Sequence, residues 1–67
     1  MTTAAAELAT VYAVFADAAE AERIGQAMVG RQLAACVNIL PPCQSIYRWQ
    51  GEIETATEVP ALFKTRL

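Results

Sequence analysis

The sequence predicts a small α+β domain, in which one amphipathic helix is flanked by apolar segments of strand-like composition. Three observations favour this class: a β-branched and aromatic run near the N-terminus, a capped helical stripe after it, and two strand-like arms around a Gln-Gly turn. A chain of 67 residues has room for one domain, so we expect residues 1–67 to form a single one.

The first expected element is a strand over Thr10–Ala16, after an alanine-rich lead-in over residues 1–8. The segment reads Thr-Val-Tyr-Ala-Val-Phe-Ala, and this β-branched and aromatic content favours a strand. It is apolar on both faces, so both faces require a cover. A helix supplies one cover, and a second element or another subunit must supply the other.

A helix is expected from Ala18 to Gln32. Asp17 is a suitable N-cap, and Glu20 three residues later gives the capping-box spacing. Apolar or small residues recur at helical spacing on one stripe, namely Ala21, Ile24, Gly25 and Met28. A glycine on this stripe, Gly25, allows the helix to lie close to a sheet.

A second strand is expected over Ala34–Leu40, and Pro41 and Pro42 then interrupt it with a bend or a bulge. Extended structure resumes over Ser45–Trp49. The next two residues, Gln50-Gly51, predict a two-residue hairpin turn because glycine readily takes a positive φ.

The return arm of this hairpin covers Glu52–Thr65 and contains Pro60, which has no N–H to donate. A proline in a strand suits an edge position or a bulge, so we expect one of the two here.

The resulting order is strand, helix, strand, strand. A right-handed crossover makes the first two strands parallel, and the third then returns antiparallel to the second. This is the first half of a ferredoxin-like, split β-α-β arrangement. We expect its C-terminal helix and last strand to be absent, so that the fold is truncated after the third strand.

Composition excludes several classes of function. The net charge is −2 and the five Lys and Arg residues are scattered, which argues against binding to nucleic acid or to an anionic membrane. No apolar run reaches the length of a membrane-spanning helix. The chain has no histidine and no glycine-rich phosphate loop, so we expect no enzyme.

The same composition favours either an oligomer or a fragment of a larger protein. Apolar residues make up 55% of the chain and charged residues only 18%, which is a poor match for a self-sufficient domain of this size. Two cysteines are too few for a disulfide scaffold, so we expect free thiols and a cytoplasmic location.

Three separated segments carry a family resemblance: Leu33–Pro41 (LAACVNILP), Ser45–Ile53 (SIYRWQGEI) and Lys64-Thr65. In this order and spacing they resemble the CutA family of divalent-cation-tolerance proteins, and the helix from Ala21 onward fits in register. The resemblance implies a ferredoxin-like fold and a compact homotrimer, in which the long hairpin of one subunit pairs with the sheet of the next. It also implies a role in metal tolerance, with copper binding in some members.

The sequence departs from the family pattern at several positions. Pro42 stands where glycine is usual, Cys43 where a small or apolar residue is common, and Glu52 where lysine is frequent. The family continues past Thr65 into a second helix and a fourth strand, which are not in this sequence.

Cys36 is the candidate metal ligand, because a thiolate suits copper(I) and this residue matches the family cysteine linked to copper. The alternative is a buried structural cysteine. Cys43 lies seven residues on, a spacing that is not a zinc signature.

Tyr47, Arg48 and Trp49 are expected to form a subunit interface, since aromatic residues and arginine are frequent interface anchors. A ligand-stacking platform is the alternative. Lys64 is either structural or lines a cleft between subunits. Three hairpin glutamates, Glu52, Glu54 and Glu58, suggest either a solvated face or a site for a hard cation.

These features give three hypotheses. The first is a trimeric binding or signalling module for divalent-metal tolerance, with copper or another divalent metal as the possible ligand. The second is a sensor of a small anionic metabolite, by analogy with PII signalling proteins. The third is a structural assembly domain without a ligand.

Overall fold

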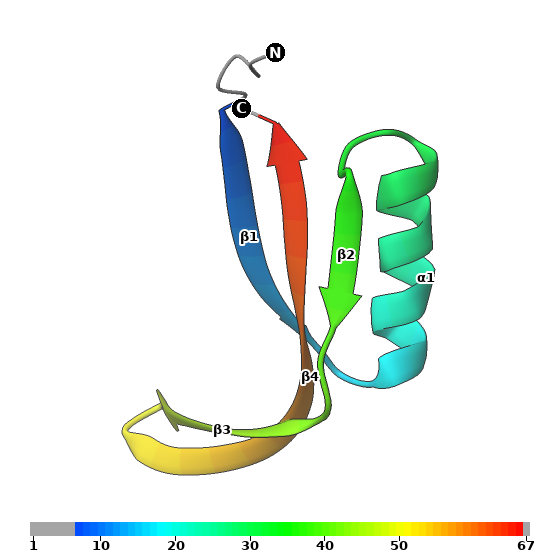
Figure 1. The fold of residues 1–67 in the computed structure, drawn as a ribbon. Coiled ribbons are helices and arrows are strands. Elements are labelled where there is room, and N and C mark those ends of the chain that lie inside the picture. Colours follow the sequence, from blue (N-terminus) through cyan, green and yellow to red (C-terminus); the bar gives the residue numbers. More distant parts are fainter. Residues whose placement is uncertain (1–6, 67) are drawn as a thin grey trace.

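The computed structural model describes residues 7–66 and confirms the α+β class (Figure 1). The elements, in order, are β1 (Leu8–Phe15), α1 (Ala18–Gly30), β2 (Cys36–Ile39), β3 (Cys43–Trp49) and β4 (Glu52–Arg66). Their order confirms the predicted strand, helix, strand and hairpin. The predicted boundaries differ by up to two residues, because strand and helix ends fray into their neighbouring turns.

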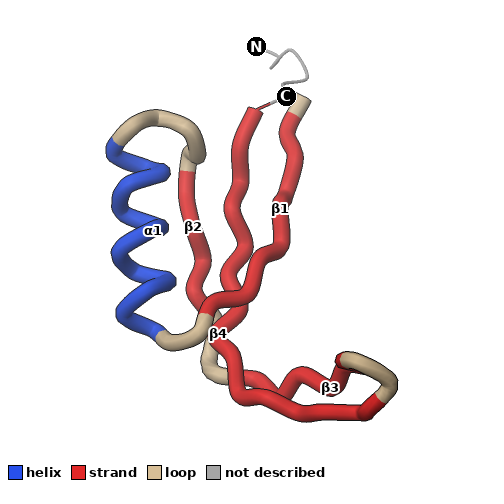
Figure 2. Tube along the Cα trace, turned by 180° about the vertical axis from the view of Figure 1, so that it is seen from behind, coloured by secondary structure: helices blue, strands red, loops and turns tan. Residues whose placement is uncertain are grey.

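The strand β4 is the centre of the sheet. It pairs antiparallel with β1 on one side and with β2 on the other, so β1 and β2 are parallel to each other as predicted. The first half of β4 pairs with β3 instead, and this β3–β4 hairpin projects away from the body of the sheet (Figure 2). The arrangement is the first part of a ferredoxin-like fold.

Pro60 corrects one prediction, because it lies in the central strand and not at an edge or a bulge. It pairs with Val14 of β1, and its carbonyl accepts a hydrogen bond of 3.0 Å from the N–H of Leu40. The backbone N and C=O of one strand residue point to the same side, so the nitrogen of Pro60, which carries no hydrogen, also points toward Leu40. The strand β2 has ended at Ile39, and the opposite side of Pro60 faces β1, so the proline removes no hydrogen bond between β4 and β1.

The helix α1 begins as predicted. The side chain of Asp17 accepts a hydrogen bond of 2.8 Å from the N–H of Glu20, and the Glu20 carboxylate accepts one of 3.0 Å from the N–H of Ala16. In a standard capping box the glutamate side chain bonds the N–H of the N-cap residue, here Asp17. In this helix it bonds the N–H of the preceding residue, Ala16, instead.

The helix ends at Gly30 and not at Gln32. Gln32 has a φ of 61°, its N–H donates to the carbonyl of Val29, and the N–H of Leu33 donates to that of Met28. These two bonds form a Schellman motif, with glutamine at the position that glycine usually takes.

The core is small and lies between α1 and one face of the sheet. Its buried residues are Ala21, Ala34, Val59, Ala61 and Phe63. The ring of Phe15 packs edge-on against that of Phe63, with 6.1 Å between the ring centroids. Gly25 faces Val37 closely enough that an added Cβ would lie 3.4 Å from its Cγ1, which confirms the close approach predicted for this glycine.

The other face of the sheet has no cover within the described residues. Side chains on this face alternate with those of the core, and they include Leu8, Tyr12 and Leu62. Leu8 is 64% exposed and Tyr12 is 62% exposed. We call this the uncovered face. The helix α1 therefore supplies one of the two predicted covers of β1, and no element among residues 7–66 supplies the second.

Candidate functional site

Cys36 lies on the uncovered face, at the start of β2. It is directly opposite Lys64 of β4, which is in turn opposite Thr10 of β1, so these three side chains form one row across the sheet. Cys36 is half-buried and its thiol is free, whereas Lys64 is exposed. A half-buried free thiol is reachable by a metal ion and is not a sealed core residue.

Cys43 is too far from Cys36 to bind the same ion within one chain. Cys36 pairs with Lys64 and Cys43 pairs with Glu58, and six residues of strand span about 20 Å. Among residues 7–66, no group of three or more His, Cys, Asp or Glu side chains lies close enough to hold a metal ion. Any site at Cys36 therefore needs ligands from outside the described part of one chain.

The predicted interface residues are all exposed and lie on the projecting hairpin. Tyr47 and Trp49 are opposite Glu54 and Glu52 on one face, whereas Arg48 is opposite Ile53 on the other. Trp49 is 58% exposed. The hairpin thus divides the three residues between two faces, and it projects away from β2 (Figure 1), the strand that contains Cys36.

The three hairpin glutamates share the face of Tyr47 and Trp49, since Glu58 is opposite Cys43 two rows below. Each carboxylate is thus beside an aromatic ring or a thiol and not beside another carboxylate directly across the ladder. This spacing is that of a mixed surface and does not concentrate ligands for a hard cation.

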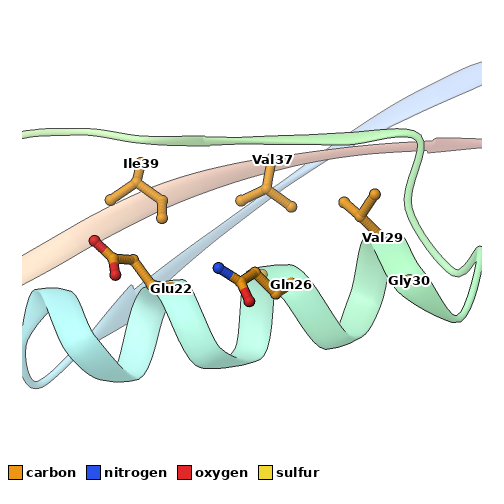
Figure 3. Close-up of a pocket in the computed structure, with 7 residues that line it drawn as sticks. Glu22, Gln26, Val29, Gly30, Val37 and Ile39 are labelled. Atoms are coloured by element: carbon orange, nitrogen blue, oxygen red, sulfur yellow. The ribbon is translucent and has the colours of Figure 1, made fainter.

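Sequence reasoning missed a groove of about 450 Å³ between α1 and β2, shown in Figure 3. We call it the α1–β2 groove; its lining residues are Glu22, Gly25, Gln26, Val29, Gly30, Val37 and Ile39. The position of β2 at the edge of the sheet leaves the groove open, and Gly25 and Gly30 add no side chains to its lining. This edge position could not be predicted without the strand order.

A second, fully apolar recess of about 220 Å³ lies on the other side of α1, over β1 and β4. Phe15, Ile24 and Met28 are among the residues that line it.

No helix within residues 7–66 is long and apolar enough to cross a membrane.

Comparison with known proteins gives a family match. A model of the CutA1 divalent ion tolerance protein family matches residues 9–67. A CutA homolog of Xenopus laevis is 42% identical over 59 residues, which cover 88% of this chain and 39% of that protein. A divalent-cation tolerance protein CutA of Archaeoglobus fulgidus is 45% identical over 56 residues, which cover 84% of this chain and 54% of the relative.

Solved structures agree with this match. The divalent cation tolerance protein of Thermus thermophilus superposes with a TM-score of 0.84 at 43% identity, over 87% of this chain and 56% of that one. CutA of Xylella fastidiosa gives a TM-score of 0.87 at 42% identity, over 90% of this chain and 58% of that one. The chain thus spans roughly half the length of these relatives. By both sequence and fold, the chain belongs to the CutA1 divalent ion tolerance family.

Proposed function

We propose that the protein acts in tolerance to divalent metal ions, as a non-catalytic module that binds a soft metal ion through Cys36. The observation that carries the proposal is the half-buried free thiol on the uncovered face of a CutA1-family sheet. A thiolate suits copper(I) among the metals available to proteins. Because residues 7–66 of one chain bring together too few ligands, we expect other copies to complete the site.

Copper(I) titration tests this proposal. We expect Cys36→Ser to abolish tight binding, because a hydroxyl is a poor ligand for a soft ion. Cys43→Ser is the matched control, since it removes the other thiol, which lies about 20 Å away along β4. Equal copper binding by Cys36→Ser and the unmodified protein would refute the role of Cys36.

We also propose that the protein assembles as a homotrimer. The uncovered face and the exposed aromatic residues of the hairpin support this, because exposed apolar surface of this extent marks an interaction site. The mass in solution, measured by light scattering, tests the proposal. A monomeric mass at high protein concentration would contradict it.

The cytoplasmic location expected from the free thiols stays a prediction.

A second candidate is a sensor of a small anionic metabolite at the same face. The ammonium group of Lys64 and the hydroxyl of Thr10 lie in one row there, and both can bind an anion. A thermal-shift screen of nucleotides and organic acids tests this candidate, with Lys64→Met as the control variant. Stabilisation by none of these compounds would refute this candidate.

A further inference from the structure

The two cysteines differ in the residue that lies across the ladder from each of them. Cys36 of β2 is directly opposite Lys64 of β4. Cys43 of β3 is directly opposite Glu58 of the same long strand. Both thiols are free and half-buried. The chain therefore holds two cysteines in similar strand positions, one paired with an amine and the other with a carboxylate.

The amine of Lys64 is within reach of the Cys36 sulfur. Directly opposite residues of an antiparallel pair share one face of the sheet, and their Cβ atoms are about 4.5–5.5 Å apart. The carbonyl of Lys64 accepts a hydrogen bond of 2.7 Å from the N–H of Ala35, which holds β2 and β4 together at this row. Lys64 is exposed, so packing does not fix its side chain, and its flexible stem can bend across the gap.

An oxidised cysteine beside an amine can form a covalent bond to it. Hydrogen peroxide converts a thiol to a sulfenic acid and is itself reduced to water. A nitrogen nucleophile then attacks the sulfenic sulfur and forms an S–N bond, and the hydroxyl group leaves as a second water with a proton from the amine. The sulfur gives two electrons to the peroxide, and the protein loses two hydrogen atoms in total.

We propose that Cys36 and Lys64 form a site of reversible oxidation, at which hydrogen peroxide converts the thiol to a sulfenic acid and the lysine amine closes a sulfenamide bond between β2 and β4. The carboxylate of Glu58 has no nitrogen to supply, so oxidation of Cys43 leads only to its oxygen acids. Two molecules of a thiol reductant reverse the bond: they are oxidised to their disulfide and return the Cys36 thiol and the Lys64 amine.

This bond also regulates the proposed metal site. The thiolate is the form of cysteine that binds a metal ion, and a sulfur bonded to nitrogen has no thiolate to offer. Peroxide therefore removes Cys36 as a ligand until a reductant restores it. This consequence rests on the proposed copper binding, whereas formation of the bond does not.

Mass spectrometry after treatment with equimolar hydrogen peroxide tests the bond. The Cys43→Ser protein is the background, so that Cys36 is the only thiol that can react. We expect this protein to lose two hydrogen atoms. We also expect trypsin to lose its cleavage after Lys64, so that the peptides of residues 32–48 and 49–66 stay joined. A thiol reductant should restore both the original mass and the cleavage.

Lys64→Arg in the same background is the matched control, because it keeps the positive charge but its guanidinium stays protonated and is no nucleophile. It should gain oxygen and lose no hydrogen. Cys36→Ser, which keeps only Cys43 opposite Glu58, should do the same. If Lys64→Arg still loses two hydrogen atoms, a backbone nitrogen forms the bond and the proposal is wrong. A background protein whose product keeps an oxygen atom, or that forms disulfide-linked dimers instead, also overturns it.

Copper(I) titration before treatment, and again after the peroxide is removed, separates this inference from the proposed function. We expect the oxidised background protein to lose copper binding and the reductant to restore it. If the bond forms but the untreated protein binds no copper, the proposed function fails and the modification site stands. If the untreated protein binds copper and no bond forms, this inference alone fails.

Discussion

Two glutamines occupy backbone conformations that glycine or asparagine usually takes. Gln32 ends α1 with a φ of 61°, and Gln50 opens the hairpin turn with a φ of 52°. The left-handed conformation costs a residue with a Cβ about 1 kcal/mol. Residue preference does not mark Gln32 as a helix end, which is why the helix was predicted to continue to it, whereas Gly51 made the turn at Gln50 predictable.

The first prediction concerns the end of α1. Gln32→Gly should raise the free energy of unfolding by about 0.5–1 kcal/mol, because glycine takes the left-handed position of a Schellman motif without strain. Gln26→Gly is the control: it makes the same change inside the helix and should lower stability by about 1 kcal/mol. Thermal or urea unfolding at fixed protein concentration measures both, and a loss of stability in Gln32→Gly would contradict the prediction.

Gly25 was correctly predicted from its place on the apolar stripe, because helix periodicity fixes which residues share a face. The face on which Cys36 lies was not predictable in this way. It depends on the pairing of Cys36 with Lys64, and a shift of one residue in that register would move the thiol to the helix side. The local sequence was therefore enough to select Cys36 as a candidate, but the face on which its thiol lies depends on the register between β2 and β4.

The second prediction tests how much room Gly25 requires. An added Cβ would be 3.4 Å from Cγ1 of Val37, which is an ordinary contact, so Gly25→Ala should be neutral or stabilising by up to about 1 kcal/mol through helix propensity. Gly25→Leu should instead destabilise by about 1–3 kcal/mol, because its larger side chain cannot fit without moving β2. Equal unfolding midpoints for the two variants would show that α1 and β2 separate freely.

At the scale of elements, the turn of the hairpin was predictable and the role of its return arm was not. Gln50 and Gly51 both have positive φ, as a two-residue turn that follows the twist of the strands requires. Pro60 indicated an edge, yet β4 is the central strand. The missing N–H of Pro60 removes no hydrogen bond within the sheet because β2 ends opposite this residue. The length of β2, which sets where that strand ends, could not be predicted from the sequence of β4 alone.

The third prediction compares two glycines. Gly51→Ala should destabilise the protein by about 1 kcal/mol or more, since alanine is strained at the φ of 82° found there. Gly30→Ala makes the same substitution within α1, where an added Cβ meets no atom within 4 Å, and should stabilise by about 0.5–1 kcal/mol. Unfolding midpoints of the two variants should therefore move in opposite directions. A shift of both midpoints in the same direction would mean that the positive φ at residue 51 does not determine the effect of Gly51→Ala on stability.

At the scale of the whole molecule, the high apolar content predicted a need for a cover, and residues 7–66 do not supply one for the uncovered face. Ala21 and Ala61 are completely buried, but their side chains are small, and much of the larger apolar surface stays exposed on the uncovered face and the hairpin. Burial of small side chains contributes little hydrophobic stabilisation, because it scales with the area removed from water. We therefore expect the protein's stability to depend on association through these surfaces.

The last prediction follows from this dependence. The unfolding temperature should rise with protein concentration, because association with other copies stabilises the folded chain by mass action. Tyr12→Glu should lower that temperature and reduce the mass in solution, since it places a charge on the uncovered face, where assembly would bury it. Ala19→Glu is the control, because it adds the same charge at an exposed position of α1. A monomer that unfolds sharply at a temperature independent of concentration, and that tolerates Tyr12→Glu as well as Ala19→Glu, would show that the small core is sufficient by itself.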